Sequence, residues 1–311
     1  MAGDWDILAV DTVVNPLTPE IAASRPSWSG DFHTGTFRQE GRVRGGYTRE
    51  EMLAMMDEAG VGQALLVAAC IGQLGLQGSW HLDPRIVADL VQWRPERFAG
   101  VAGLDPTQGM TGVRALRRAV REYGFVGAHG YPHWFELPPD HARWYPLYAE
   151  CCELDVPVQL QVGQSLVYDP KRPLRSVGRP IALDGVACDF PELKLIGIHI
   201  GIPWHEEMIA MAWKHRNVFI VADAHAPKHW PESFVRYIDS YGQDKVMFGT
   251  DFPVLGFRRM REEVEALKLR PGPRRKFLRD NALRVYRLSG GEAPALPTGS
   301  EAPPSVPPAR A

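Results

Sequence analysis

The sequence has few cysteines and pairs none of them in a Cys-x-x-Cys motif. Four cysteines among 311 residues do not make the framework of a small disulfide-rich secreted protein, which favours reduced thiols in the cytoplasm. No apolar run approaches the roughly 20 residues of a membrane span, and the N-terminus lacks the basic residues of a signal peptide. A cytoplasmic protein with no membrane partner is therefore expected.

The chain also lacks an excess of charge of either sign. Lys and Arg number 35 against 37 Asp and Glu, for a formal net charge of -2. Such a balance produces no overall field that would attract nucleic acid or an anionic membrane. A small-molecule substrate is the expected partner, and assembly into a homo-oligomer remains open.

Strand-like and helix-like segments alternate along the chain, which predicts a parallel sheet with helical crossovers. The predicted strands are 7–13, 63–69, 98–104, 125–129, 156–162, 193–199, 218–222 and 245–248. The predicted helices are 48–59, 84–93, 110–123, 144–154, 181–189, 206–214, 231–241 and 274–288. Eight such units predict a single (β/α)8 TIM barrel, which typically needs about 250 residues.

An open doubly wound sheet is the alternative fold, but the first strand-to-helix turn has no glycine-rich fingerprint for a dinucleotide. Residues 15–47 form a long first βα loop, and a loop of this length is typical of a lid or a binding loop. The barrel is assigned to residues 1–289. Residues 290–311 are rich in Pro and Ala and are predicted to be a disordered tail.

Two strand ends carry the leading catalytic candidates. Asp251 follows the apolar run from Lys245, and His199 follows the run from Leu193 with Gly201 just behind it. A carboxylate at the mouth of a buried strand is costly unless it has a partner or a task. Asp251 as a turn or cap residue and His199 as a buried core histidine are the structural alternatives.

Further polar groups at strand ends and in loops are candidate substrate ligands. His129 lies among small residues, and Arg38 and Arg175 are placed in loops where an arginine can bind a carboxylate. Ordinary surface charge is the alternative for the arginines. Trp28, Trp80, Trp134 and Trp204 sit near predicted loops, where they would either wall an aromatic pocket or pack in the core.

Several segments together resemble the amidohydrolase-related family. They are 51–61, 93–106, 193–201, 248–253 and 280–286, and the resemblance runs from about Ile7 to Leu288. Members of that family include aminocarboxymuconate-semialdehyde decarboxylase and pyrone-dicarboxylate lactonase. The resemblance implies a TIM barrel in which His199 and Asp251 act as acid/base or water-orienting residues.

The metal ligands of that family are mostly missing here. Its opening Asp-x-His-x-His motif corresponds to Asp11 to Asn15, with Val13 and Asn15 at the two His positions, and its fifth-strand His corresponds to Gln161. A catalytic zinc needs at least three protein ligands. The degenerate metal site predicts no metal cofactor, with a divalent ion such as zinc, held by recruited neighbours such as His129, as the alternative.

These observations predict a metal-independent enzyme that hydrolyses or hydrates a small carboxylated or ring-derived substrate. Asp251 would be the base, His199 its partner, and His129, Gln161, Asn15, Arg38 and Arg175 the substrate contacts. Two alternatives stay open at this point. One is a decarboxylase of an aromatic or muconate-type acid, and the other is a barrel that binds without catalysis.

Overall fold

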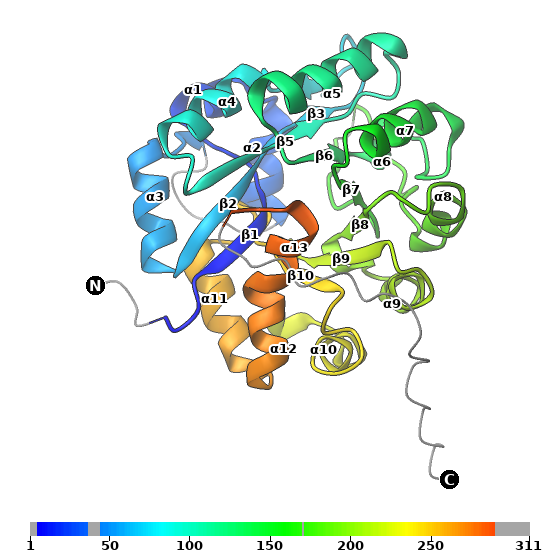
Figure 1. The fold of residues 1–311 in the computed structure, drawn as a ribbon. Coiled ribbons are helices and arrows are strands. Elements are labelled where there is room, and N and C mark those ends of the chain that lie inside the picture. Colours follow the sequence, from blue (N-terminus) through cyan, green and yellow to red (C-terminus); the bar gives the residue numbers. More distant parts are fainter. Residues whose placement is uncertain (1–4, 37–43, 170, 290–311) are drawn as a thin grey trace.

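The protein folds as a barrel of eight parallel strands surrounded by helices (Figure 1). A computed structural model describes residues 5–36, 44–169 and 171–289. The barrel strands are β1 (Ala9–Val14), β2 (Val61–Ala68), β5 (Phe98–Gly103), β6 (Gly127–Gly130), β7 (Val158–Gln161), β8 (Leu195–Ile198), β9 (Val218–Ala222) and β10 (Val246–Phe248). All eight predicted strands are confirmed, and so is the TIM barrel.

The sheet closes between its first and last strands. Strand order follows the chain from β1 to β10, and a parallel bridge joins Val14 to Phe252 just beyond β10. The backbone N–H of Asn15 donates to the carbonyl of Phe252 at 2.8 Å, and the Thr12 hydroxyl donates to the carbonyl of Phe248 at 2.8 Å. Closure therefore brings the C-terminal ends of β1 and β10 together.

Helices form the outer layer, and several begin at residues that suit a helix start. The chief outer helices are α3 (Arg49–Glu58), α4 (Pro84–Trp93), α5 (Met110–Tyr123), α7 (Tyr145–Glu153), α8 (Leu183–Asp189), α9 (His205–Lys214), α10 (Glu232–Ile238), α11 (Phe257–Ala266), α12 (Pro271–Arg275) and α13 (Asn281–Tyr286). Thr48 and Glu51 form a reciprocal capping box before α3. Asp83 caps α4, whose first residue is Pro84.

The last crossover differs from the prediction. The sequence predicts one helix over 274–288, whereas the chain forms α11 directly after β10, then α12, a π-helical turn over Lys276–Asp280 and α13. α11 was missed because it carries many charges and buries only a narrow stripe that includes Phe257, Met260 and Val264.

Short elements in the loops cover one end of the barrel. The long first loop contains α1 (Pro19–Ser24), α2 (Ser27–Asp31) and a π-helical turn over Phe32–Thr36. A hairpin of β3 (Cys70–Ile71) and β4 (Trp80–His81) follows β2, and α6 (Pro132–Phe135) follows β6. The rings of Trp28 and Trp134 meet at 4.6 Å between centroids, and Trp28 donates to the carbonyl of Gly78. Loops after three different strands are thereby tied together.

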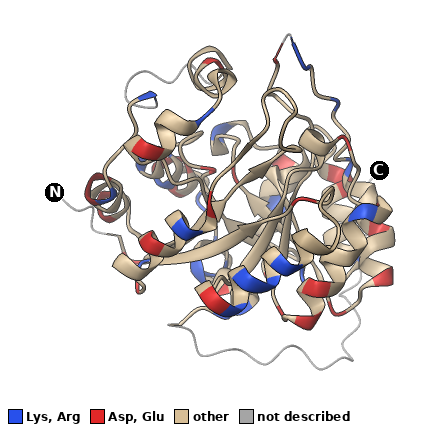
Figure 2. Ribbon diagram, turned by 90° about the horizontal axis from the view of Figure 1, so that it is seen from above, with Lys and Arg blue, Asp and Glu red and all other residues tan. Residues whose placement is uncertain are grey.

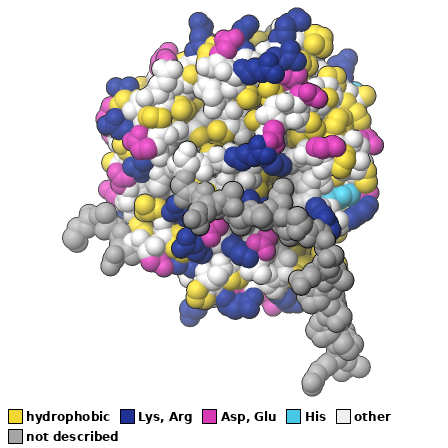
Figure 3. Space-filling model, in the orientation of Figure 1, with side chains coloured by type: hydrophobic (Ala, Val, Ile, Leu, Met, Phe, Trp, Pro, Cys, Tyr) yellow, Lys and Arg dark blue, Asp and Glu magenta, His cyan; other side chains and the backbone are white. Residues whose placement is uncertain are grey.

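Charges of both signs are mixed over the described residues in the views of Figures 2 and 3. Basic and acidic residues are interspersed along the outer helices (Figure 2), and on the face shown in Figure 3 apolar side chains are scattered among them. Within the part of the chain that the structure describes, no helix is both long enough and apolar enough to cross a bilayer. The predicted disordered tail lies outside the described residues.

Candidate active site

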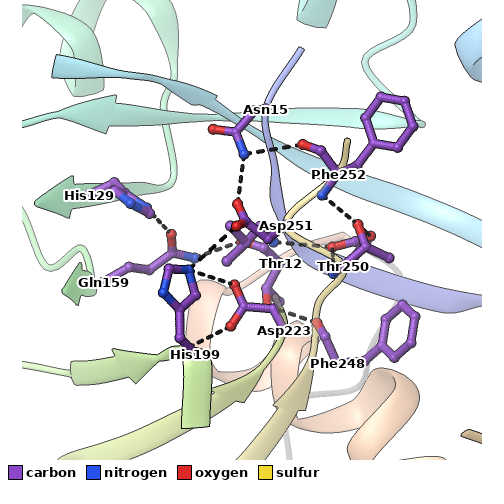
Figure 4. Close-up of polar contacts among 12 residues, drawn as sticks. Thr12, Asn15, His129, Gln159, His199, Asp223, Phe248, Thr250, Asp251 and Phe252 are labelled. Atoms are coloured by element: carbon purple, nitrogen blue, oxygen red, sulfur yellow. Dashed lines mark hydrogen bonds and ion pairs between the residues drawn. The ribbon is translucent and has the colours of Figure 1, made fainter. Parts of the chain in front are cut away.

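Three neighbouring strands place an imidazole and two carboxylates at one end of the barrel. His199 directly follows β8, Asp223 follows β9, and Asp251 comes three residues after β10. Nε2 of His199 lies 3.6 Å from Oδ2 of Asp223 and 3.6 Å from Oδ2 of Asp251 (Figure 4). We call these three residues the mouth cluster. The expectation that His199 and Asp251 face one another is met.

The backbone at these strand ends is held in an unusual conformation. His199 has φ of 66°, Asp251 has φ of 54°, and Ala224, next to Asp223, has φ of 59°. Residues with a Cβ adopt this left-handed region at a cost of about 1–3 kcal/mol each, and such strain gathers at functional sites. The turns aim the three side chains inward.

Hydrogen bonds fix the orientation of both carboxylates. Asn15 donates through Nδ2 to Oδ1 of Asp251 at 2.7 Å, and the backbone N–H of His199 donates to Oδ1 of Asp223 at 2.6 Å. Behind them the fully buried Asp11 accepts hydrogen bonds from the backbone and the hydroxyl of Thr250. Each mouth carboxylate thus has one oxygen held by the protein and Oδ2 turned toward His199.

Two atoms of the mouth cluster are buried without a hydrogen-bond partner among the described residues. They are Nε2 of His199 and Oδ2 of Asp223. Burial lowers the pKa of His199 well below its usual value. Burial, reinforced by the nearby Asp251, raises the pKa of Asp223 well above that of an ordinary carboxyl group, and burial also raises the pKa of Asp251. The site is short of positive charge.

The mouth cluster fits a divalent cation. A ligand atom from each of the three residues lies within 4.8 Å of the other two. Carboxylate oxygens suit manganese and magnesium, and a neutral imidazole is a common additional ligand. A bound cation would satisfy both unpartnered atoms and would lower the cost of placing two carboxylates in a buried site. This set contains His199 and Asp251, which the family resemblance already places in the site, and adds Asp223.

His129 presents a free ring nitrogen near the mouth cluster, and its tautomer follows from its partner. Nε2 of Gln159 donates to the carbonyl of Thr12 at 2.7 Å and to the hydroxyl of Tyr286, so Oε1 of Gln159 is the acceptor facing Nδ1 of His129 at 2.8 Å. Nδ1 therefore carries the proton, and Nε2 has a lone pair. Burial lowers the pKa of His129 to about 4, so the ring is neutral at pH 7.

Of the other predicted substrate contacts that the structure describes, some lie at the mouth of the barrel and one does not. Asn15 binds Asp251, as described above, and Gln161 is half-buried at the end of β7. Arg175 is exposed, and its Nη1 pairs with Oε1 of Glu136 at 2.8 Å, so the structure does not bring it to the mouth cluster. Arg38 lies outside the described residues.

One residue of the mouth cluster, Asp223, was not singled out from the sequence. It was one of many polar residues at strand ends, although the run before it, Val218–Ala222, is as apolar as the one before His199. Reading each predicted strand for the first charged residue beyond it would have found Asp223.

A model of the amidohydrolase family matches residues 73–288, more than half of the chain. The chain belongs to the amidohydrolase family. The resemblance found in the sequence is thereby confirmed, and so is the expectation of an enzyme.

Among curated proteins, gamma-resorcylate decarboxylase of Rhodococcus jostii (strain RHA1) is 26% identical over 253 residues, covering 65% of this chain and 74% of the decarboxylase. The 2-keto-4-carboxy-3-hexenedioate hydratase of Sphingobium sp. (strain NBRC 103272 / SYK-6) is 34% identical over 165 residues, covering 46% of this chain and 47% of the hydratase. That second match spans less than half of either chain.

Solved structures show the same fold at low identity. Dihydroxybenzoic acid decarboxylase of Polaromonas sp. JS666, crystallised with manganese and the inhibitor 2-nitroresorcinol, superposes with a TM-score of 0.67. The two chains are 19% identical, and the match covers 92% of this chain and 99% of that one.

These findings correct two expectations. Metal-independent hydrolysis or hydration is contradicted, because the relatives and neighbours that match over most of the chain include several aromatic acid decarboxylases, some of them crystallised with manganese. The expectation of no cofactor is also wrong, because such neighbours were crystallised with manganese. The absence of histidine at Val13, Asn15 and Gln161 does not by itself exclude a cation, because Asp223 and His199 could supply other ligand atoms next to Asp251.

Proposed function

We propose that this protein is a divalent-metal-dependent decarboxylase of a hydroxylated aromatic acid. The observation that carries the proposal is the mouth cluster, in which two carboxylates and a neutral imidazole converge with two ligand atoms unpartnered. The similarity to gamma-resorcylate decarboxylase over 65% of the chain supports the same reaction class.

His199 and Asp223 would hold the cation through Nε2 and Oδ2, the two buried atoms of the mouth cluster without a hydrogen-bond partner among the described residues, with Asp251 beside them. When bound, the metal supplies positive charge that stabilises the anionic oxygens of the substrate. Of the two carboxylates, Asp223 is fully buried, whereas the side chain of Asp251 is 15% exposed. Asp251 is therefore the carboxyl group that a substrate at the mouth can touch.

Asp251 is the proton donor in this proposal. Its proton adds to the ring carbon that bears the carboxylate. The bond from that carbon to the carboxylate then breaks, its electron pair restores the aromatic ring, and carbon dioxide leaves. Asn15 holds Oδ1 of Asp251 during the transfer, and solvent at the mouth returns the proton to Asp251, whose side chain is 15% exposed.

The neutral Nε2 of His129 gives the site an acceptor for a phenolic hydroxyl of the substrate. Tyr131 provides an aromatic surface next to His129, because it is buried and its ring centre lies 4.4 Å from that of His129. An aromatic acid with a hydroxyl group meets both requirements.

Release of carbon dioxide tests the proposal. Purified protein is incubated with gamma-resorcylate and with monohydroxybenzoates, with added Mn²⁺ and after treatment with a chelator. Carbon dioxide should form from at least one acid with Mn²⁺ present, should fall to the background rate after chelation, and should recover when Mn²⁺ is restored.

Retention of full activity in the chelated, metal-free protein would remove the metal from the proposal. No carbon dioxide from any acid of the set in the manganese-loaded protein would overturn the assigned reaction.

A further inference from the structure

Arg25 is a half-buried cation in the long first loop, and its Nε is buried. It directly follows α1. Its guanidinium carbon lies 5.3 Å from the centre of the Trp80 ring, and the indole N–H of Trp80 donates to the hydroxyl of Ser24, the neighbouring residue, at 3.2 Å. Two contacts from the β3–β4 hairpin thus fix the position of this arginine.

The guanidinium has no anionic partner among the described residues. Its Nε is buried without a hydrogen bond, and no carboxylate of the described chain lies within ion-pair distance of it. Burial lowers the pKa of Arg25 to about 10, while the charges of Tyr131 and Asp251 raise it. Arg25 is therefore still positively charged at pH 7, and Asp251 of the mouth cluster is one of the groups that favour its charged form.

A buried charge without a partner is costly, and one that persists in a cleft is typical of a ligand site. Stacking on Trp80 keeps the guanidinium plane in place but uses none of its N–H donors. A planar guanidinium with unused donors matches a carboxylate, which accepts two parallel hydrogen bonds.

The other arginines in the described parts of the loops around the mouth have partners. Arg172 donates to the carbonyls of Gln77 and Trp134 and to the hydroxyl of Ser79. Arg175 pairs with Glu136, and Arg179 pairs with Glu207. Arg44, in the same first loop as Arg25, is exposed and lies 3.6 Å from Asp31. Arg25 differs from these because its Nε is buried and its guanidinium has no hydrogen bond or ion pair with any described residue.

We propose that Arg25 is the residue that binds the carboxylate of the aromatic acid, with Trp80 holding the guanidinium in place. The inference rests on the proposed function, since it assigns a substrate contact for that reaction. Arg25 would set the orientation of the ring by fixing the group that is lost. It would also select acids over neutral phenols of the same shape.

A matched pair of ligands isolates this role. Gamma-resorcylate and 2-nitroresorcinol share a ring and two hydroxyl groups, and they differ in carrying a carboxylate or an uncharged nitro group. Their Kd values are measured by calorimetry on the manganese-loaded protein, for the wild type, Arg25→Gln and Arg25→Lys. Arg44→Gln is the control for loss of a loop arginine.

Arg25→Gln should weaken gamma-resorcylate binding by about 10- to 100-fold, because it removes a charged hydrogen-bonding partner. 2-Nitroresorcinol should bind within about twofold of the wild type, Arg25→Lys should recover part of the affinity for the acid, and Arg44→Gln should change neither Kd. In turnover assays with gamma-resorcylate, Arg25→Gln should raise KM more than it lowers kcat.

Two results would overturn the assignment. An equal loss of affinity for both ligands would make Arg25 a structural residue of the loop. Unchanged binding of gamma-resorcylate in Arg25→Gln, with decarboxylation intact in the wild type, would reject Arg25 and leave the proposed function standing. A wild-type protein that binds neither ligand would reject the proposed function together with this inference. Melting temperatures of all variants report whether each is folded.

Discussion

Two groups of three metal-ligating side chains occur in the described part of this protein, and they differ in what their atoms already bind. The mouth cluster joins His199, Asp223 and Asp251, and a second group on the outer helices joins Asp184, Cys188 and His215. In both groups the ligand atoms lie within 4.8 Å of one another. We call the second group the surface cluster.

The surface cluster has little binding capacity left. Oδ1 of Asp184 accepts hydrogen bonds from Lys214 and from His215, each at 2.6 Å. The hydrogen bond from Lys214, followed by that from His215, lowers the pKa of Asp184, and the thiol of Cys188 is exposed to solvent. In the mouth cluster, two of the atoms have no hydrogen bond to any residue that the structure describes.

This contrast shows that proximity of ligand types is a poor guide to a metal site by itself. The surface cluster carries its own cation, because the Lys214 ammonium balances Asp184. The mouth cluster holds two carboxylates beside a neutral imidazole in a buried setting, where an added positive charge stabilises the arrangement. The predictions below test that difference.

Asp251→Asn should have the largest effect on activity. The amide keeps the shape of the side chain but cannot donate a carboxyl proton, so kcat for decarboxylation should fall on the order of 10²–10⁴-fold. Asp184→Asn, the same change in the surface cluster, should leave kcat within about twofold of the wild type. Carbon dioxide release and thermal unfolding are measured for both variants.

Similar losses of kcat in the two variants would mean that the mouth cluster has no catalytic role that the surface cluster lacks. Full activity in Asp251→Asn would exclude Asp251 as the proton donor.

Asp223→Asn should mainly affect metal binding. The variant loses the charge of a proposed ligand while its Oδ1 can still accept the hydrogen bond from the His199 backbone, so the fold should persist. The Kd for Mn²⁺ should rise by at least about 10- to 100-fold, as measured by calorimetry on chelator-treated protein.

Asp184→Asn again provides the comparison, and its Mn²⁺ stoichiometry and Kd should equal those of the wild type. Loss of the bound ion in Asp184→Asn, with retention in Asp223→Asn, would reverse the assignment of the two clusters.

Sequence patterns predicted the barrel because each strand carries its own local signal. The runs that precede His199 and Asp251 are apolar, β-rich and followed by turn residues, which is sufficient to place both side chains at the mouth of a parallel barrel. The prediction failed for α11, where ten residues bury a narrow stripe between charged residues.

The metal expectation failed for a different physical reason. A comparison of Val13, Asn15 and Gln161 with the family positions tests only whether the family's own metal ligands are present. A cation, however, can bind to any suitable donor atoms that lie close together in the folded chain. The sequence marks Asp223 as a charge beyond an apolar strand, but its contact with His199 becomes visible only when β9 is placed between β8 and β10. Arg25 could not be selected from the sequence either, because its lack of a partner is a property of the folded chain.

Asn15→Ala should have a moderate effect. It removes the hydrogen bond that holds Oδ1 of Asp251 at 2.7 Å, so kcat should fall by about 10-fold, as expected for about 1.4 kcal/mol of lost positioning. Asn217→Ala is a matched control, because Asn217 donates to the carbonyls of Phe190 and Ala187 near the surface cluster.

Both alanine variants should lose about 1 kcal/mol of unfolding free energy in chemical denaturation. Only Asn15→Ala should lose activity. A kcat for Asn15→Ala equal to that of the wild type would show that Asp251 needs no help from Asn15.

Lys214→Ala should produce the smallest effect, which is tighter binding of a metal ion at the surface cluster. Removing the ammonium frees one lone pair of Asp184 next to His215 and the exposed thiol of Cys188, a ligand set that suits zinc. Because Lys214 is 54% exposed, its ion pair contributes little, and Zn²⁺ binding at the surface cluster should tighten by only about fivefold.

Cobalt substitution reports the thiolate ligand by its charge-transfer absorption, and adding Cys188→Ser should abolish that signal. If Lys214→Ala binds no better than the wild type, occupied lone pairs are not what separates the two clusters, and the burial of the mouth cluster must account for the difference alone.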